Sequence, residues 1–156
     1  MRRLGITKEN NDYINLPKAQ PEKQIKSKDI LKVKGGQETI LVVDDEEMVL
    51  GLLENTLKKY GYNVKTATDG DIALDIYKED KDLIDAVILD LTMPKMSGEM
   101  LLEKMLEINP DVKVIISSGH SEEDIQEEVL TKAKGYVKKP YKLKNIVQIL
   151  RTVLDL

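Results

Sequence analysis

Five short apolar runs alternate with five amphipathic segments from Thr39 onward. The runs are rich in Val and Ile and have the length of buried strands, whereas the other segments repeat apolar residues at helical spacing. Repeated strand-helix units predict an α/β fold with a parallel sheet and right-handed crossovers. The expected strands are residues 39–44, 63–67, 84–89, 113–118 and 135–138.

Capping residues mark the expected helix boundaries. Asp69 and Ser97 are placed to cap the second and third helices, and Gly61 is placed to end the first. The fourth helix is expected to begin with the capping box Ser121-Glu-Glu-Asp124. Because its apolar stripe is thin, we expect it to be either an exposed edge helix or a moving part.

Residues 1–36 read differently from the rest of the chain. They show no sustained periodicity and close on Gly35-Gly36, which predicts an extension or linker followed by a single domain at 37–156. The segment holds nine Lys and Arg against four Asp and Glu, so it is basic whereas the domain is acidic. Without interleaved aromatic residues, a solvated linker is favoured over contact with nucleic acid or lipid.

Composition excludes several classes of protein. The absence of cysteine rules out disulfides, thiolate metal sites and thiol catalysis. No apolar run approaches the roughly 20 residues that span a bilayer, and the N-terminus lacks the apolar region of a signal peptide. We therefore expect a cytoplasmic chain with no membrane contact. Its 41% hydrophobic and 33% charged residues are ordinary for a soluble domain.

Aspartates stand at the ends of two of the expected strands. Asp44 ends the first strand and Asp45 follows it, and Asp90 follows the third strand. If these strands are parallel neighbours, their carboxyl ends meet at one edge of the sheet and the three carboxylates converge. Such a cluster repels itself unless a cation or a proton relieves it. Carboxylate oxygens suit a hard divalent ion such as Mg²⁺, so this edge is a candidate metal and phosphate site.

Two further strand ends carry polar groups: Ser117 and Ser118 lie at the end of the fourth strand, and Lys138 and Lys139 lie at the end of the fifth. Taken together with the aspartates, these residues make the chain resemble the receiver domain of two-component response regulators. The resemblance covers residues 38–154. The matching segments are 41–46 (Leu-Val-Val-Asp-Asp-Glu), 87–98 (Val-Ile-Leu-Asp-Leu-Thr-Met-Pro-Lys-Met-Ser-Gly), 115–119 (Ile-Ile-Ser-Ser-Gly) and 135–140 (Gly-Tyr-Val-Lys-Lys-Pro). It implies a flavodoxin-like, doubly wound (βα)5 fold with a five-stranded parallel sheet in the order 2-1-3-4-5.

The resemblance assigns the metal site and the phosphoacceptor. Asp90 would accept a phosphoryl group from a phosphohistidine on a histidine kinase or a histidine phosphotransfer protein. Mg²⁺, or Mn²⁺, would be bound by Asp44, Asp45, Asp90 and the backbone carbonyl of Thr92. The domain would catalyse its own phosphorylation and dephosphorylation and is not expected to be an enzyme otherwise.

The resemblance also assigns the groups that bind and sense the phosphoryl group. Lys139 and Ser118 would contact its oxygens, with Ser117 as the competitor for the role of Ser118. Ser118 and Tyr136 would switch the face made by the fourth helix, fifth strand and fifth helix, although a tyrosine here also fits simple edge packing.

Three further positions follow from the same resemblance. Thr92 and His120 occupy the positions that tune phosphoryl lifetime, although His120 also fits a merely exposed loop residue. The peptide bond before Pro140 is expected to be cis.

The N-terminal segment gives a weaker indication of the kind of protein to which the domain belongs. Residues 12–19 (Asp-Tyr-Ile-Asn-Leu-Pro-Lys-Ala) resemble the end of a histidine-kinase ATP-binding domain, which suggests the receiver end of a hybrid kinase. A stand-alone regulator or phosphorelay intermediate is the alternative. Output would come from a partner or the parent protein, with no nucleic-acid contact and with a phosphorylation-dependent dimer left open.

Readings from other classes fit the residues less well. The acidic run after the first strand would repel a flavin phosphate, and Asp44-Asp45 lacks the Asp-x-Asp spacing of an aspartyl-nucleophile phosphatase. A scaffold-only receiver would be expected to lack site residues.

Overall fold

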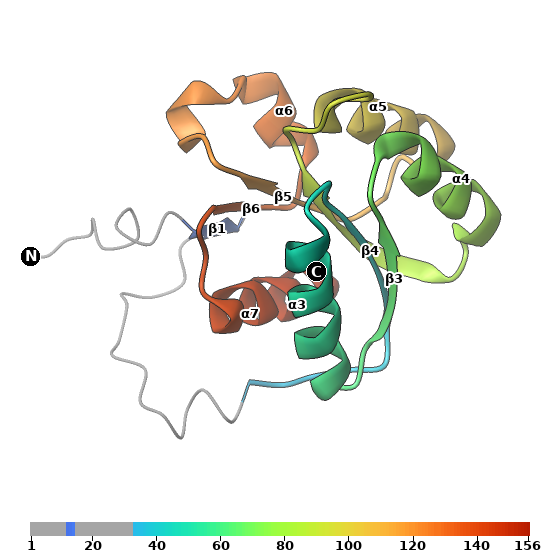
Figure 1. Ribbon diagram of the computed structural model, residues 1–156, viewed down its shortest axis with the longest axis vertical. Helices are drawn as coiled ribbons and strands as arrows, with labels where there is room; N and C mark the ends of the chain where they lie inside the picture. The colour runs from blue at the N-terminus through green and yellow to red at the C-terminus, as the bar shows by residue number, and fades with distance from the viewer. Residues whose placement is uncertain (1–11, 15–32) are drawn as a thin grey trace, which may run out of the picture.

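A six-stranded sheet forms the centre of the computed structural model, which describes residues 12–14 and 33–156 (Figure 1). The strands are β1 (Asp12–Ile14), β2 (Thr39–Val43), β3 (Asn63–Ala67), β4 (Ile84–Asp90), β5 (Val114–Ser118) and β6 (Gly135–Lys138). The helices are α3 (Glu47–Lys59), α4 (Gly70–Asp80), α5 (Gly98–Ile108), α6 (Glu127–Lys132) and α7 (Leu143–Leu154), with a 3-10 turn η1 (Glu122–Asp124) before α6.

Five of the strands are parallel and lie in the order β3-β2-β4-β5-β6. Numbered along the chain from the first expected strand, this order is 2-1-3-4-5, so the predicted topology is confirmed. It makes β2 and β4 direct neighbours, and the carboxyl ends of both strands lie at the same edge of the sheet. The sequence order is reversed between β2 and β4, which is where doubly wound sheets place their sites.

The sixth strand, β1, was not expected from the sequence. It pairs antiparallel with β6, with Asp12 opposite Val137 and Ile14 opposite Gly135. β1 thus covers what is otherwise the free edge of β6. Residues 1–11 and 15–32 of the predicted 1–36 extension, including the Leu16-Pro17 part of the kinase-like motif, lie outside the described residues.

Helices cover both faces of the sheet, as Figure 1 shows. α3 and α7 lie on one face, and α4, α5 and α6 lie on the other. Alternate strand residues serve the two cores, since Ile40 and Val42 of β2 pack toward α3 and α7, and Leu41 and Val43 pack toward the opposite layer. Burial of both faces explains why the strands read as continuous apolar runs.

Local signals placed most helix ends correctly. Asp69 Oδ1 accepts the Ile72 N–H at 2.9 Å at the start of α4, and Ser97 Oγ accepts the Met100 N–H at 3.2 Å at the start of α5. Gly61 follows α3 with φ of 99°, a left-handed conformation that favours glycine.

The predicted start of the fourth helix was wrong. Ser121 precedes the η1 turn, and its hydroxyl donates to the Asp124 carboxylate at 2.8 Å instead of capping a helix. α6 begins only at Glu127 and is 6 residues long. Its single buried residue is Val129, which agrees with the expectation of a thinly anchored helix.

A partly buried arginine connects the start of the domain to its last helix. Arg151 of α7 donates to Glu38 Oε2 at 2.7 Å and to the Gly35 carbonyl at 3.0 Å, and it also pairs with Asp155. The pKa of Glu38 is lowered, chiefly by its hydrogen bond to Arg151. Residues 33–38 are therefore fixed against the domain. Within residues 12–14 and 33–156, no helix has the length and apolar character needed to cross a bilayer.

Candidate functional site

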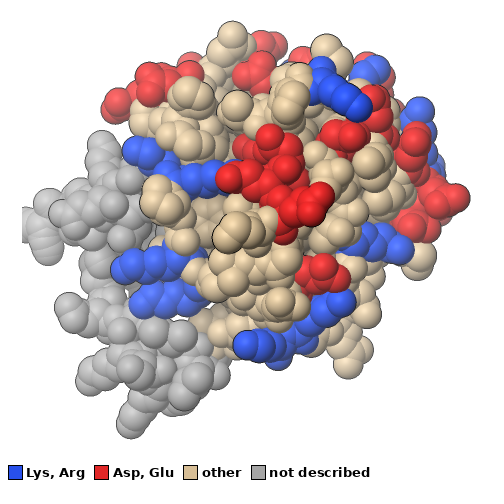
Figure 2. All heavy atoms as spheres, viewed as in Figure 1, with Lys and Arg blue, Asp and Glu red and all other residues tan. Residues whose placement is uncertain are grey.

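Three carboxylates meet at the carboxyl edge of the sheet. Asp44 directly follows β2 and Asp90 ends β4, and both are buried, with 2% and 4% exposure. Asp45 is exposed beside them, and one oxygen from each carboxylate lies within 4.8 Å of the others. Figure 2 shows acidic side chains gathered where β2 leads into α3, with basic side chains beside them toward α7. The predicted convergence is therefore present in the structure.

Lys139 supplies the positive charge of this cluster. It follows β6, and its Nζ lies 2.7 Å from Asp44 Oδ2, 3.5 Å from Asp90 Oδ2 and 3.8 Å from Glu46 Oε1. Burial acts to lower the pKa of Lys139, but the hydrogen bond to Asp44 and the charge of Asp90 outweigh it and raise the pKa. The side chain is thus a fixed ammonium ion that partly neutralises two buried carboxylates.

Asp90 has a perturbed ionisation. Burial, with a further contribution from the charges of Asp44 and Asp45, raises the pKa of Asp90 to about 6. The Thr92 N–H, which donates to Asp90 Oδ1 at 3.1 Å, and the charge of Lys139 act in the opposite direction. An additional cation would favour the ionised form, so this carboxylate is poised for a positively charged ligand.

The donor set fits Mg²⁺. Carboxylate oxygens are the ligands that a hard divalent cation prefers, and Mg²⁺ keeps several waters, so a site with two buried carboxylates and one exposed carboxylate suits it. The Thr92 carbonyl remains a predicted ligand, because the structure shows only the Thr92 N–H acting on Asp90.

The expected switch residues lie together on the neighbouring strands. Ser118 is fully buried at the end of β5, and its Oγ accepts the His120 N–H at 3.0 Å. The Tyr136 hydroxyl donates to the His120 carbonyl, and the ring is only 3% exposed. Tyr136 is therefore turned inward, with its hydroxyl bonded to the loop after β5.

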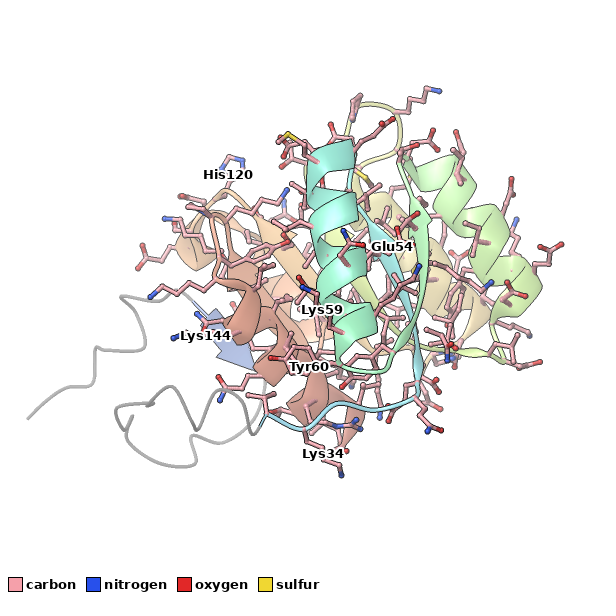
Figure 3. All side chains as sticks on the ribbon, turned by 60° about the horizontal axis from the view of Figure 1, so that its bottom comes forward. Lys34, Glu54, Lys59, Tyr60, His120 and Lys144 are labelled. Atoms are coloured by element: carbon pink, nitrogen blue, oxygen red, sulfur yellow. The ribbon has the colours of Figure 1, made fainter. Side chains whose placement is uncertain are left out.

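The two positions expected to tune phosphoryl lifetime are both exposed. Thr92 follows the phosphoacceptor strand, and the His120 side chain projects outward from its loop (Figure 3). His120 reaches its neighbours through backbone groups, to Ser118 and Tyr136. The Lys139-Pro140 peptide bond is cis, as the resemblance implies.

Sequence reasoning missed two groups at this site. Glu46 lies within 3.8 Å of Lys139, and the Glu46 N–H donates to Asp44 Oδ1 at 2.9 Å, which orients that carboxylate. Tyr141 follows the cis-proline with its hydroxyl buried behind the site. The only available signal was position, since Glu46 directly follows Asp45 and Tyr141 directly follows Pro140.

Comparison with known proteins supports the resemblance to receiver domains over most of the chain. A family model described as the response regulator receiver domain matches residues 40–151. The chemotaxis protein CheY of Treponema pallidum is 37% identical over 125 residues, covering 79% of this chain and 87% of that protein. The sensor kinase CckA of Brucella abortus is 33% identical over 140 residues, covering 89% of this chain but only 14% of the kinase.

Solved structures show the same fold. A response regulator receiver domain protein from Clostridium thermocellum has a TM-score of 0.72 at 32% identity, covering 76% of this chain and 94% of that one. CheY of Borrelia burgdorferi, solved as a complex with CheX, BeF3 and Mg²⁺, has a TM-score of 0.71 at 33% identity, covering 74% and 88%.

Proposed function

Because this chain belongs to the response regulator receiver family, we propose that it takes a phosphoryl group from a phosphohistidine of a partner protein onto Asp90. The partner is a histidine kinase or a histidine phosphotransfer protein. The observation that carries the proposal is the position of Lys139 Nζ between two buried carboxylates, 2.7 Å from Asp44 and 3.5 Å from Asp90. A lysine held there can meet a phosphoryl group on Asp90 without leaving the strand edge.

The proposed transfer is a simple exchange of bonds. An oxygen of Asp90 attacks the phosphorus, an O–P bond forms, and the P–N bond breaks with its electron pair left on the imidazole nitrogen. Such transfer depends on positioning and on neutralising charge more than on covalent assistance. The Thr92 N–H fixes one oxygen of Asp90, while the other faces Lys139.

The residues that would hold Mg²⁺ are Asp44, Asp45, Asp90 and the Thr92 carbonyl. When bound, the ion would supply positive charge to the phosphoryl oxygens during transfer. Lys139 supplies a second positive charge from the β6 side. Without both, a dianionic donor would meet three carboxylates, and approach would be strongly unfavourable.

The proposed output is a change in the face formed by α6, β6 and α7. Ser118 would leave the His120 N–H to bond the new phosphoryl group, which would move the loop that the Tyr136 hydroxyl holds. Since Tyr136 is already buried, loading would stabilise the inward ring more than it would rotate it. Thr92 and His120 would tune the lifetime of the acyl phosphate from its exposed side.

An exposed apolar surface lies beside the site and suits the partner. Met48 and Leu52 of α3 are 85% and 54% exposed. Leu52 lines a groove of about 400 Å³ between α3 and the turn after β6, and Lys139 and Glu46 also line this groove. A phosphohistidine domain that packs its apolar face here would bring its imidazole next to Asp90.

For the larger context we propose the receiver end of a hybrid sensor histidine kinase. The match to CckA covers more of the chain than residues 37–156 contain, so it extends into the segment with the kinase-like motif. The proposal places the chain in the cytoplasm, where ATP-dependent kinases obtain phosphoryl groups. An antibody against this domain should detect a native polypeptide far larger than 17.7 kDa. A native polypeptide of about 17.7 kDa would instead identify a stand-alone regulator.

The phosphoacceptor assignment is tested with acetyl phosphate as a small donor. The protein should become labelled only with Mg²⁺, and Asp90→Asn should abolish the label. Equal labelling of both proteins would refute Asp90 as the acceptor.

A further inference from the structure

Two buried hydroxyl groups behind the site have no hydrogen-bond partner within the described part of the chain. They are Ser117 Oγ, on a residue that is 2% exposed, and Tyr141 Oη. An unpaired buried hydroxyl is unfavourable, and native proteins contain few of them. The two unpaired hydroxyls therefore require a structural or functional explanation.

The two hydroxyls are neighbours. Burial and the charge of Asp44 raise the pKa of Tyr141, so the phenol keeps its proton, while the nearby Ser117 hydroxyl acts in the opposite direction. No hydrogen bond of ordinary geometry joins them in this state. The phenol can donate and the serine oxygen can accept, so a small movement would complete one bond.

The two hydroxyls come from segments next to the phosphoacceptor and next to the lysine. Ser117 of β5 stands opposite Asp90 of β4 and opposite Val137 of β6, so its side chain lies on the same face as Asp90. Tyr141 comes two residues after Lys139, on the turn that leads into α7. Ser117 thus belongs to the fixed strand, and Tyr141 belongs to the turn that carries the lysine.

That turn is fixed to β5 at its beginning. The Lys139 N–H donates to the Ser118 carbonyl at 2.7 Å. Beyond Pro140, the Tyr141 hydroxyl is the group placed to form a second attachment to the same strand. In the free protein Lys139 Nζ is closer to Asp44 than to Asp90, and a phosphoryl group on Asp90 would attract it from the other side.

We propose that Tyr141 and Ser117 are positioning residues for Lys139. When a phosphoryl group on Asp90 draws Lys139 away from Asp44, the Tyr141 hydroxyl donates to Ser117 Oγ and holds the turn in the loaded position. The hydrogen bond is made in the loaded protein and is absent from the free one. This inference rests on the proposed phosphorylation of Asp90.

The test compares free and loaded protein, with beryllofluoride and Mg²⁺ as the phosphoryl mimic. Tyr141→Phe and Ser117→Ala should leave the free protein as stable as the unaltered one or more so, because each removes an unpaired hydroxyl. Each should weaken beryllofluoride binding, measured by calorimetry at saturating Mg²⁺, by roughly two- to tenfold, the value of one net hydrogen bond. The affinity for Mg²⁺ alone should not change. The double variant should bind no more weakly than either single one.

Tyr77→Phe is the matched control. Tyr77 is fully buried, and its hydroxyl accepts a hydrogen bond from Asn109 at 3.3 Å on the far side of the sheet. This variant should lose stability and bind beryllofluoride normally.

Three outcomes would overturn the inference: normal beryllofluoride binding by Tyr141→Phe, additive losses in the double variant, or a loss of stability in the free protein that accounts for the weaker binding. Failure of the proposed function looks different, because Asp90→Asn would then still accept label from acetyl phosphate.

Discussion

Lys139 Nζ lies 2.7 Å from Asp44 Oδ2, although the two residues are 95 positions apart in the chain. The contact joins the strand end of β6 to that of β2 across the two strands between them. It partly neutralises a carboxylate cluster that would otherwise destabilise the fold. The same ammonium group is the one that the proposed function uses to meet a phosphoryl group.

Removal of this lysine should affect stability and phosphorylation together. Lys139→Ala leaves Asp44 and Asp90 buried without their counterion, so the free energy of unfolding should fall by roughly 1–3 kcal/mol, less than for a fully buried pair because Lys139 is partly exposed. Labelling by acetyl phosphate should slow by about 100-fold. Lys138→Ala is the control, since successive strand residues point to opposite faces. Similar effects of both substitutions would mean that charge in general matters, and not the Lys139 contact.

The pKa of Asp90 predicts an unusual pH dependence. Because the folded state raises this pKa from 3.8 to about 6, the folded protein binds the proton more tightly than the unfolded one. The contribution of Asp90 to the free energy of unfolding should therefore decrease as pH rises from about 4 to about 6. Asp90→Asn removes this loss and should be more stable than the unaltered protein at pH 7 by roughly 1–3 kcal/mol. Urea unfolding without Mg²⁺ measures the difference, which should shrink toward pH 4. A difference that is independent of pH would contradict the pKa assignment.

Two glycines should respond to alanine in opposite ways. A Cβ at Gly51, inside α3, would meet nothing within 4 Å, so Gly51→Ala should stabilise the protein by about 0.5–1 kcal/mol through helix propensity. A Cβ at Gly98 would lie 2.4 Å from the Asp90 carbonyl oxygen, so Gly98→Ala should destabilise the protein and slow its labelling. Thermal unfolding of both variants checks the contrast. Destabilisation by Gly51→Ala would show that this position is not open.

The exposed surface of α3 should matter to a protein donor and not to a small one. Met48→Ser and Leu52→Ser should slow transfer from a phosphorylated histidine kinase or phosphotransfer protein by about tenfold, the effect of losing an apolar anchor. Labelling by acetyl phosphate should be unchanged. Leu83→Ser is the control, since Leu83 is 60% exposed and precedes β4 at the opposite end of the sheet. Normal transfer to both α3 variants would exclude this docking surface.

Sequence alone predicted the parts of the molecule that depend on local pattern. Apolar runs ending in Asp44 and Asp90 indicated parallel strands with a shared edge, and Asp69 and Ser97 marked helix starts because capping is a local interaction. The resemblance then supplied the strand order and the roles of the site residues.

Features that depend on tertiary contacts could not be predicted in this way. β1 has only 3 residues and becomes a strand because the edge of β6 is open to it. The Ser121 hydroxyl could bond either the Asp124 carboxylate or the first backbone N–H groups of a helix. The sequence does not show that the bond to Asp124 forms. The neighbouring hydroxyls of Ser117 and Tyr141 come from segments that only the folded sheet brings together.

The central claim is that Asp90 is the residue that carries the phosphoryl group, and its most direct test locates that group chemically. After labelling with acetyl phosphate and Mg²⁺, borohydride reduces an aspartyl phosphate to homoserine, which peptide mass spectrometry can place in the chain. We predict homoserine at position 90 and none at positions 44 or 45. Homoserine at another aspartate, or labelled protein without any homoserine, would contradict the account.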